Sequence, residues 1–179
     1  DDYVRYGKEM GMEVIKNEAF QIDGVNISSS VIRSLLKEGE VELANQALGY
    51  PYTIIGKVVN GYHEGRKLGF PTANLDLSHF GQMIPESGVY AVKVRMENSV
   101  VWRQGMMNVG TRPTFDGKRI TLETHIFNFD GDIYDQLLLV SFVKRIRGEQ
   151  KFDSPEELAA QLKEDEQTIM EIFEEEKEK

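Results

Sequence analysis

Cysteine is absent from the 179-residue sequence, which excludes disulfides, thiolate nucleophiles and zinc sites built on sulfur. Long apolar runs are absent too, because no stretch approaches the roughly 18 residues that a membrane span requires. The segment Asp1 to Arg5 lacks the charge and the apolar core of a secretory signal. We therefore expect a cytoplasmic protein without a membrane partner, and the hydrophobic share of 40% predicts a packed core.

Basic residues are outnumbered by acidic ones, 21 to 30, and the formal net charge of −9 argues against a general nucleic-acid binder. Much of the acidic excess follows Asp153 and is therefore local. The body of the chain keeps basic residues that could form a pocket for an anionic ligand: Arg33, Arg66, Lys67, Arg112, Lys118 and Arg119.

The first 50 residues have a helical pattern. Hydroxyl residues at Ser28 to Ser30 precede apolar residues at helical spacing, which predicts a helix that ends at Gly39. A second short helix, Glu40 to Leu48, is expected to end at Gly49. Before these, Tyr3 to Ile15 has the pattern of a helix end and a short strand, which we interpret as the tail of an upstream domain.

From Tyr52 onward the pattern becomes extended, with segments rich in β-branched and aromatic residues separated by turns such as Asp116-Gly117-Lys118. Five or six short strands without helices between them predict a mainly β fold, a small closed or nearly closed antiparallel barrel. Tyr90, Trp102, Phe115 and Phe127 are expected in its core. The clearest strand candidates are Thr53–Val59, Gly88–Met96, Val100–Asn108, Ile120–Phe129 and Leu137–Lys144.

A C-terminal helix is predicted to start at Ser154-Pro155, because serine is a good N-cap and proline suits the first helical position. One face should pack on the barrel, since Leu158, Leu162, Ile169, Ile172 and Phe173 recur at helical spacing. The polar end from Glu174 to Lys179 is expected to fray.

A glycine-rich stretch follows the first predicted strand of the barrel. Its glycines would let the backbone approach an anion, and its two basic residues could bind phosphate oxygens. An ordinary hairpin turn explains the same pattern, and the stretch lacks the ending of a Walker loop. The residues concerned are Gly56, Gly61, Gly65, Arg66 and Lys67.

Thr72 and Asn74 stand two residues apart, so an extended backbone would present both on one face. Magnesium prefers oxygen ligands and takes one or two from the protein while phosphates and water supply the rest. A polar turn after Pro71, with Asn74 capping the backbone, is an equally good interpretation of the spacing alone.

Several motifs together resemble riboflavin kinases over about Tyr52 to Phe173, in the order expected for that family. Each motif alone is unspecific, whereas the combination is specific. They are Gly65-Arg66-Lys67-Leu68-Gly69-Phe70-Pro71-Thr72-Ala73-Asn74, Pro85-Glu86-Ser87-Gly88-Val89-Tyr90, Asn108-Val109-Gly110-Thr111-Arg112-Pro113-Thr114-Phe115, Glu123-Thr124-His125-Ile126-Phe127-Asn128-Phe129 and Arg147-Gly148-Glu149-Gln150-Lys151-Phe152-Asp153-Ser154.

The resemblance implies a six-stranded barrel that transfers the γ-phosphate of ATP to the terminal ribityl hydroxyl of riboflavin, giving FMN. It implies Mg²⁺ or another divalent ion at Thr72 and Asn74, and a catalytic Glu123. Gly56, Gly61, Gly65, Arg66, Lys67, Thr72 and Asn74 are the implied nucleotide-binding residues, and Arg147 and Phe152 are candidates for flavin binding. By pattern alone a surface residue of a half-buried strand is the favoured interpretation of Glu123, and His125 receives no role.

The segment Ile27 to Arg33 resembles a phosphate-contacting motif of nucleotidylyltransferases, although plain helix capping explains it as well. Bifunctional bacterial FAD synthetases carry such a domain before the kinase barrel. We therefore interpret residues 1–50 as the helical remnant and linker of a Rossmann-like adenylyltransferase domain and residues 51–179 as the kinase barrel. This chain lacks the adenylyltransferase's own nucleotide motif, so we expect no FAD synthesis from it.

Two further hypotheses remain open: a barrel that binds flavin or nucleotide without turnover, and an accessory domain that contacts its adenylyltransferase partner. One departure from the family pattern concerns Asp135, where the family usually has glycine. If that position needs a positive φ, aspartate tolerates it at some cost.

Overall fold

The computed structural model describes residues 20–22, 25–27, 29–59, 71–78, 81–129 and 131–177. Among these residues, strands β1 (Phe20–Ile22) and β2 (Val25–Ile27) form a separate two-stranded sheet. Two helices follow, α2 (Ser29–Lys37) and α3 (Val41–Leu48). Gly39 and Gly49 end them with φ of 79° and 80°, which confirms both predicted helices. The elements predicted within residues 3–15 lie outside the described residues.

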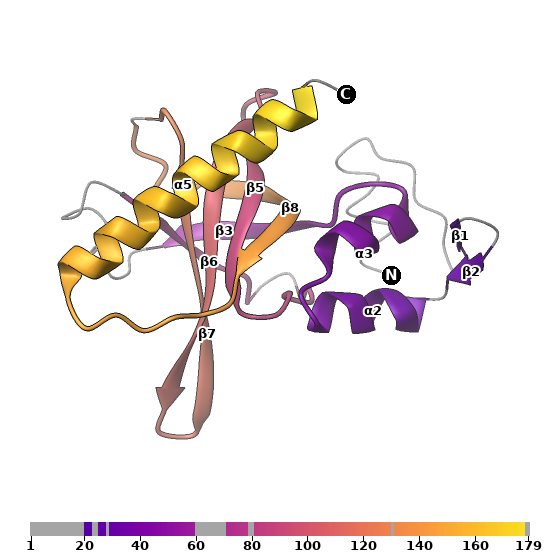
Figure 1. Cartoon of the computed structure of the whole chain (residues 1–179), viewed down its shortest axis with the longest axis horizontal. Helices are drawn as coiled ribbons and strands as arrows, with labels where there is room; N and C mark the ends of the chain where they lie inside the picture. The colour runs from indigo at the N-terminus through magenta and orange to yellow at the C-terminus, as the bar shows by residue number, and fades with distance from the viewer. Residues whose placement is uncertain are drawn as a thin grey trace.

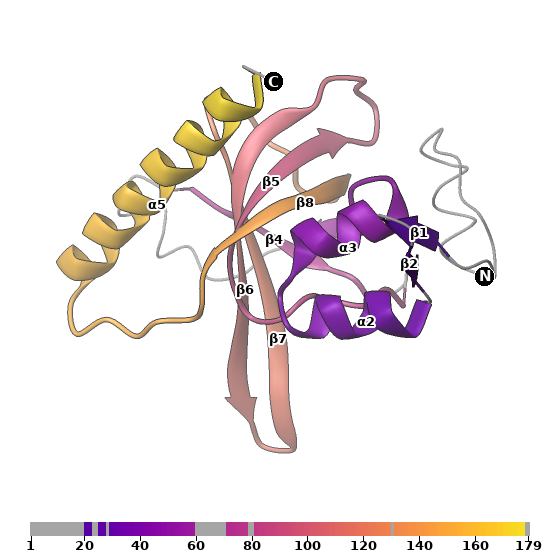
Figure 2. The same cartoon turned by 45° about the vertical axis from the view of Figure 1, so that its right-hand side comes forward.

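Six strands form a closed antiparallel barrel in the order β3-β4-β7-β6-β5-β8, and Figures 1 and 2 together label these strands. This confirms the predicted barrel. The sixth strand is the short β4, which follows Pro71-Thr72 and had been predicted only as an extended motif. The bounds are β3 (Thr53–Val59), β4 (Ala73–Asp76), β5 (Gly88–Met96), β6 (Arg103–Thr114), β7 (Gly117–Ile126) and β8 (Leu137–Arg147).

The β6–β7 hairpin is longer than predicted, and its strands are shifted along the sequence from the expected Val100–Asn108 and Ile120–Phe129. Its ladder runs from Gly105 paired with Ile126 to Thr114 paired with Gly117, so that Phe115 and Asp116 make the turn. The expected turn at Asp116-Gly117-Lys118 was therefore one residue late, because Gly117 already pairs as a strand residue. The far end of this ribbon projects away from the barrel (Figures 1 and 2).

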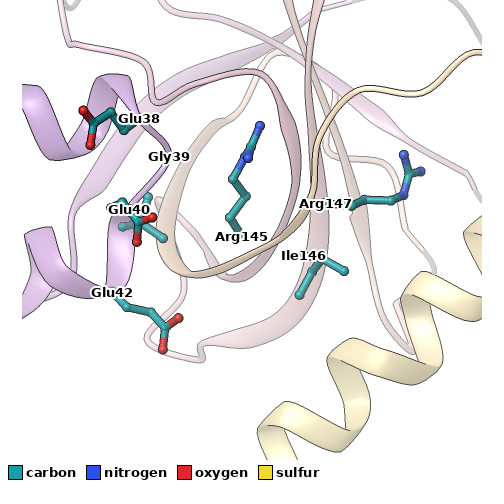
Figure 3. A pocket seen from close by; sticks show the side chains of 8 residues that line it. Glu38, Gly39, Glu40, Glu42, Arg145, Ile146 and Arg147 are labelled. Carbon is teal, nitrogen blue, oxygen red and sulfur yellow. The ribbon is translucent and has the colours of Figure 1, made fainter.

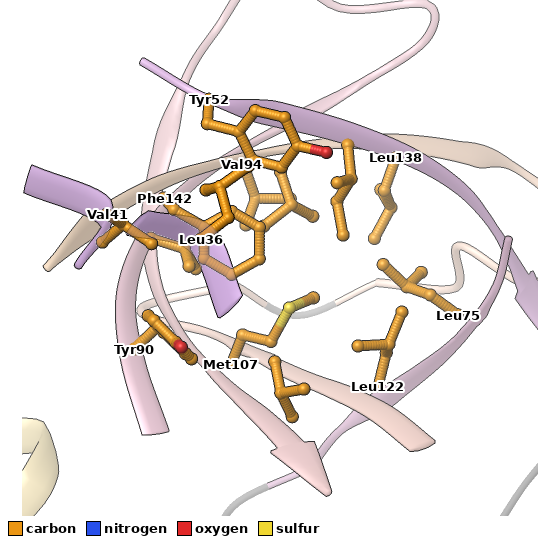
Figure 4. Close-up of a cluster of buried hydrophobic side chains, with 14 of the residues drawn as sticks. Leu36, Val41, Tyr52, Leu75, Tyr90, Val94, Met107, Leu122, Leu138 and Phe142 are labelled. Carbon is orange, nitrogen blue, oxygen red and sulfur yellow. The ribbon is translucent and has the colours of Figure 1, made fainter. Parts of the chain in front are cut away.

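Alternate side chains of the strands fill the barrel with hydrophobic groups (Figure 4). Tyr90 is buried in this core, as predicted, and Phe127 is buried in a second cluster on the outer surface of the barrel, but Trp102 is 40% exposed and Phe115 is fully exposed. The prediction was wrong for these two because Trp102 precedes β6 at the β5–β6 connection and Phe115 lies at the ribbon turn. Within the described residues neither place has a second layer of helix or strand over the ring, and the Arg95 guanidinium carbon lies 5.6 Å from the ring centroid of Trp102.

The helices α2 and α3 share this core through buried residues such as Leu36 and Val41 (Figure 4). The Asn45 amide of α3 donates to the Phe142 carbonyl at 2.8 Å and accepts from the Tyr52 N–H at 2.7 Å. The boundary predicted between residues 50 and 51 therefore falls inside one continuous hydrophobic core.

The last helix, α5 (Pro155–Lys177), starts as predicted. Its N-cap is Ser154, whose hydroxyl accepts from the Glu157 N–H at 3.2 Å. The helix continues to Lys177 instead of fraying at Glu174. It lies on the outer surface of the barrel, on the side opposite α2 and α3 (Figures 1 and 2). Ile169 and Phe173 are its buried contacts there.

Candidate active site on the outer face of the barrel

One transverse row of paired residues crosses all six strands. The Cα register links Val59 to Asn74, Asn74 to Glu123 and Glu123 to Asn108, and the row then continues to Val89 and Arg147. Directly paired residues present their side chains on the same face of a sheet. This row therefore collects four of the polar side chains, Asn74, Glu123, Asn108 and Arg147, from four different strands.

The row faces outward. On β7, Leu122, Thr124 and Ile126 are buried, whereas Glu123 between them is only half-buried. Because successive side chains of a strand point to opposite faces, Glu123 lies on the outer surface. The local reason is the alternation in the sequence, since apolar or small groups occupy every second position from 122 to 126.

Asn74 and Thr72 lie at the start of β4 beside Glu123, and both are half-buried. The Asn74 Nδ2 atom is buried and has no hydrogen-bond partner within the described residues. A buried polar group without a partner is costly, and a ligand oxygen could satisfy it. The threonine hydroxyl and the asparagine carboxamide are hard oxygen donors of the kind that magnesium accepts, so the residues fit the implied ion.

A cleft of about 960 Å³ opens beside Asn74. It forms because β4 pairs with β7 only at Ala73 and Asn74, whereas the β6–β7 ribbon continues outward. Arg112 and Arg119 line the cleft and lie directly opposite each other in the ribbon ladder. Directly opposed like charges are unfavourable in a sheet, and an anion between them would offset that repulsion.

Sequence reasoning missed this arginine pair and Asn108. It had noted Arg112 and Arg119 only as basic residues of the body, because their pairing depends on the hairpin register. A turn placed at Phe115-Asp116 would have found them, since it puts residues 112 and 119 opposite each other. Asn108 is exposed beside Glu123, and no pattern in the sequence singles it out within its motif.

Gly56 does not join the row. It lies within β3 and is buried, and a Cβ added there would approach Leu77 Cδ2 to 2.6 Å. The glycine thus allows the segment after β4 to pack closely against β3. The other predicted loop residues, Gly61, Gly65, Arg66 and Lys67, lie outside the described residues.

Arg147 lies at the other end of the row and is held by α5. Its guanidinium donates to both carboxylate oxygens of Asp165, at 2.9 to 3.1 Å. The Asp165 side chain is only 3% exposed, and it also accepts from Gln161 Nε2 at 2.9 Å. The Phe152 ring centroid lies 5.8 Å from the guanidinium carbon. The predicted flavin pair is therefore brought together, with Arg147 engaged in a bidentate ion pair.

The loop after β8 has a second attachment. The Glu149 carboxylate accepts from the backbone N–H of Thr111 at 2.8 Å and from its hydroxyl at 3.1 Å. This connects residues 147–153 to β6 near Asn108. The loop is thus anchored on both α5 and the barrel, so its position relative to Glu123 is defined by tertiary contacts.

A smaller polar pocket of about 190 Å³ lies at the junction of α2, α3 and β8 (Figure 3). Glu38, Glu40 and Glu42 line one side, and Arg145 lines the other (Figure 3). Arg145 donates to the Ser87 carbonyl at 2.6 Å. Three carboxylates make this pocket unsuitable for phosphate, so it is not an alternative to the cleft beside Asn74.

Tyr90 lies behind this junction with its side chain fully buried. Its hydroxyl donates to the Glu86 carbonyl. Burial raises its pKa to about 12, and the nearby Arg145 cation only partly opposes that rise. The phenol therefore acts as a neutral hydrogen-bond donor that joins β5 to the preceding loop.

Asp135, which stands where the family usually has glycine, has the positive φ that was considered for this position. Asp135 has φ of 70°, in the left-handed region. Its carboxylate lies 2.9 Å from Lys57 Nζ. The hydrogen bond and charge of Asp135 raise the pKa of the exposed Lys57. Asp135 therefore adopts a strained backbone conformation and forms an ion pair at the surface.

Fold and site together define a small closed antiparallel barrel with a polar, solvent-facing site along its outer surface. A family model described as flavokinase, riboflavin kinase, matches residues 48–173. The chain belongs to the riboflavin kinase family.

Curated relatives carry the name bifunctional riboflavin kinase/FMN adenylyltransferase. The protein from Haemophilus influenzae is 42% identical over 93% of this chain and 53% of its own length, and the Escherichia coli protein is 41% identical over 93% and 52%. The Bacillus subtilis protein is 42% identical over 82% and 46%. The chain thus spans about half the length of the curated relatives it matches.

Two solved structures have a similar fold. A Streptococcus pneumoniae structure described as a macrolide-efflux protein is 38% identical with a TM-score of 0.78, covering 85% of this chain and 49% of that one. The riboflavin kinase of Trypanosoma brucei has a TM-score of 0.50 at 22% identity, covering 69% of this chain and 80% of that one. Its likeness supports the fold alone. In the described part of this chain no helix has the length and apolar character of a membrane span.

Proposed function

We propose that this chain phosphorylates riboflavin: the γ-phosphate of ATP passes to the terminal ribityl hydroxyl, and FMN and ADP are formed. The observation that carries the proposal is the pairing of Asn74 with Glu123 in the same row as Arg147. Neighbouring strands lie about 4.8 Å apart, so Glu123 is one strand from Asn74 and three strands, roughly 14 Å, from Arg147. The nucleotide would bind at the Asn74 end and the flavin at the Arg147 end.

In this arrangement Glu123 acts as the general base. Its carboxylate accepts the proton of the ribityl hydroxyl while that oxygen forms the new bond to the γ-phosphorus and the bond to ADP breaks. A base must lie between the two substrates for this transfer. Glu123 is the carboxylate of the row, and it lies between the two proposed substrate ends.

The remaining residues bind and orient. Thr72 and Asn74 would hold a divalent ion, which supplies charge neutralisation for the phosphates when bound. Arg112 and Arg119 would face phosphate oxygens across the cleft. Asn108 would orient the ribityl chain beside Glu123, and the Arg147–Phe152 pair would contact the flavin. Because ATP is a substrate, we place the reaction in the cytoplasm.

We also propose that adenylyl transfer to FMN belongs to the upstream part of a longer protein, as the names of the relatives suggest. Residues 1–50 would be the end of that domain and its linker, with the α2–α3 part packed into the core of the barrel. Incubation of this chain with FMN, ATP and magnesium should accordingly yield no FAD. Formation of FAD by the purified chain would contradict this assignment.

The direct test is incubation of the purified chain with riboflavin, ATP and MgCl₂, followed by chromatographic separation of FMN from riboflavin. FMN should accumulate with one ADP per FMN, and an excess of EDTA should stop it. Absence of FMN with magnesium, manganese and zinc salts alike would overturn the kinase assignment. Tight binding of riboflavin in that case would favour a binding module.

A further inference from the structure

His125 lies two residues after Glu123 on β7 and therefore on the same outer face. Its side chain is only 12% exposed. Its Nδ1 lies 2.8 Å from the carbonyl oxygen of Pro71. Its Nε2 lies 3.7 Å from Glu166 of α5. The imidazole is thus enclosed between the barrel, the final helix and the segment that leads into β4.

The donor in the bond to Pro71 can be assigned. A carbonyl oxygen only accepts, so the proton must reside on Nδ1 of the histidine. The ring is also oriented by Phe127, whose ring centroid lies 5.6 Å away. Phe127 is in turn buried in the cluster with Ile169 and Phe173 of α5. The direction of the Nδ1–H bond is therefore determined by packing.

This bond lies where the barrel is weakest. The β4–β7 ladder consists of two residue pairs, Ala73 with Thr124 and Asn74 with Glu123, whereas the β6–β7 ladder has ten. Pro71 has no N–H group with which to extend the β4–β7 ladder. Its carbonyl is bound by the His125 side chain instead, which attaches the entry to β4 beyond the last pair.

We propose that His125 is a positioning residue for the phosphate-transfer site: through Pro71 it holds Thr72 and Asn74 in register with Glu123. This role rests on the proposed function, because it assigns the metal and nucleotide to Thr72 and Asn74. His125 does not touch the reacting atoms. It acts through the backbone of the segment that does, and α5 supports the ring from behind.

Two substitutions separate the hydrogen bond from the volume of the ring. His125→Phe keeps an aromatic β-former against Phe127 but removes the donor. His125→Asn places an amide N–H near the position of Nδ1 and restores it. In hydrogen exchange followed by mass spectrometry, His125→Phe should raise the exchange of residues 72–75 about fivefold, the effect of losing one ordinary hydrogen bond. His125→Asn should return it close to wild type.

Kinetics and binding supply the functional readout. His125→Phe should lower kcat by about tenfold or more, as expected when reacting groups are misplaced by a fraction of an ångström, with KM for riboflavin little changed. Calorimetry should show weaker binding of magnesium–ADP to His125→Phe and recovery in His125→Asn. Wild-type exchange and wild-type magnesium–ADP affinity in His125→Phe would overturn the proposal. So would a folded His125→Asn that behaves like His125→Phe.

A measurement on the wild type covers the case in which His125→Phe does not fold. The ¹⁵N shifts of the imidazole should show a protonated Nδ1 at pH 8, with slow exchange of that proton. A ring protonated only at Nε2 would contradict the bond to Pro71. If the wild-type chain makes no FMN, the kinase assignment fails, while the tautomer and the exchange data still decide whether His125 holds this segment.

Discussion

Asn74 of β4 lies directly opposite Glu123 of β7, although the two are separated by 49 positions in the sequence. The pairing brings the carboxamide that would bind the nucleotide end beside the carboxylate that would accept the proton. Positioning of this kind accounts for much of the rate enhancement in phosphoryl transfer, because the protein itself forms no covalent bond to the transferred group in most such enzymes.

Glu123→Gln should lower kcat by about 100-fold or more, because the amide cannot accept the proton in a general-base step. Binding of magnesium–ADP, followed by calorimetry, should change little. Glu171→Gln, on an exposed position of α5, is the matched control and should retain full activity. A Glu123→Gln protein with wild-type kcat would remove this residue from the base role.

Arg147→Met should destabilise the fold by about 3 kcal/mol, since it leaves the buried Asp165 carboxylate without its cation. Urea unfolding measures this loss. Lys144→Met is a control on the same strand, because Lys144 is exposed, and should cost little. If Arg147 also contacts the flavin, KM for riboflavin will rise in the fraction that stays folded. Unchanged stability would show that the ion pair does not hold α5.

Asp135→Gly should be more stable than Asp135→Ala by about 1 kcal/mol, because alanine carries the Cβ penalty at φ of 70° and glycine does not. Both substitutions lose the ion pair with Lys57, so their difference isolates the backbone. Thermal unfolding of the two variants at one pH gives the comparison. Equal stabilities would mean that the turn relaxes away from the left-handed region.

Tyr90 should make the fold sensitive to alkaline pH. Its pKa is raised to about 12 in the folded protein, against about 10 for a tyrosine in the unfolded chain. Its contribution is complete below pH 10 and is lost as pH rises from 10 toward 12, because the unfolded state then releases the proton first. The loss approaches about 3 kcal/mol for a shift of this size.

Tyr90→Phe is the variant that reveals this contribution. It should be less stable than wild type by about 1 kcal/mol at pH 8, because it lacks the hydrogen bond to the Glu86 carbonyl. Urea unfolding at pH 8, 10 and 11.5 should show that gap shrinking and then reversing. A gap that stays constant over this range would contradict the raised pKa.

Local chemistry in the sequence was enough for many of the elements. Ser154 as N-cap and Gly39 and Gly49 as helix ends are decided within a few residues, so those predictions are confirmed. The strands β3 and β5 were predicted with their observed bounds for the same reason. The motifs over Tyr52 to Phe173 also identified the family, which the match over residues 48–173 confirms.

Other features depend on contacts between distant segments. Trp102 and Phe115 are exposed because they lie where the strands of the barrel end. The identity of an aromatic residue does not predict that position. The packing role of Gly56 depends on Leu77. Arg112 and Arg119 lie opposite each other because of the hairpin register. A turn placed one residue earlier or later would change that register.

By itself the sequence determined the family, the barrel, the terminal helix and the residue types of the proposed site. The tertiary structure alone decided that Asn74, Glu123, Asn108 and Arg147 form one row, and that His125 binds the Pro71 carbonyl. The physical reason is that strand pairing joins residues far apart in the chain. Propensities and turn signals act over a few residues, whereas register is set by closure of the whole barrel.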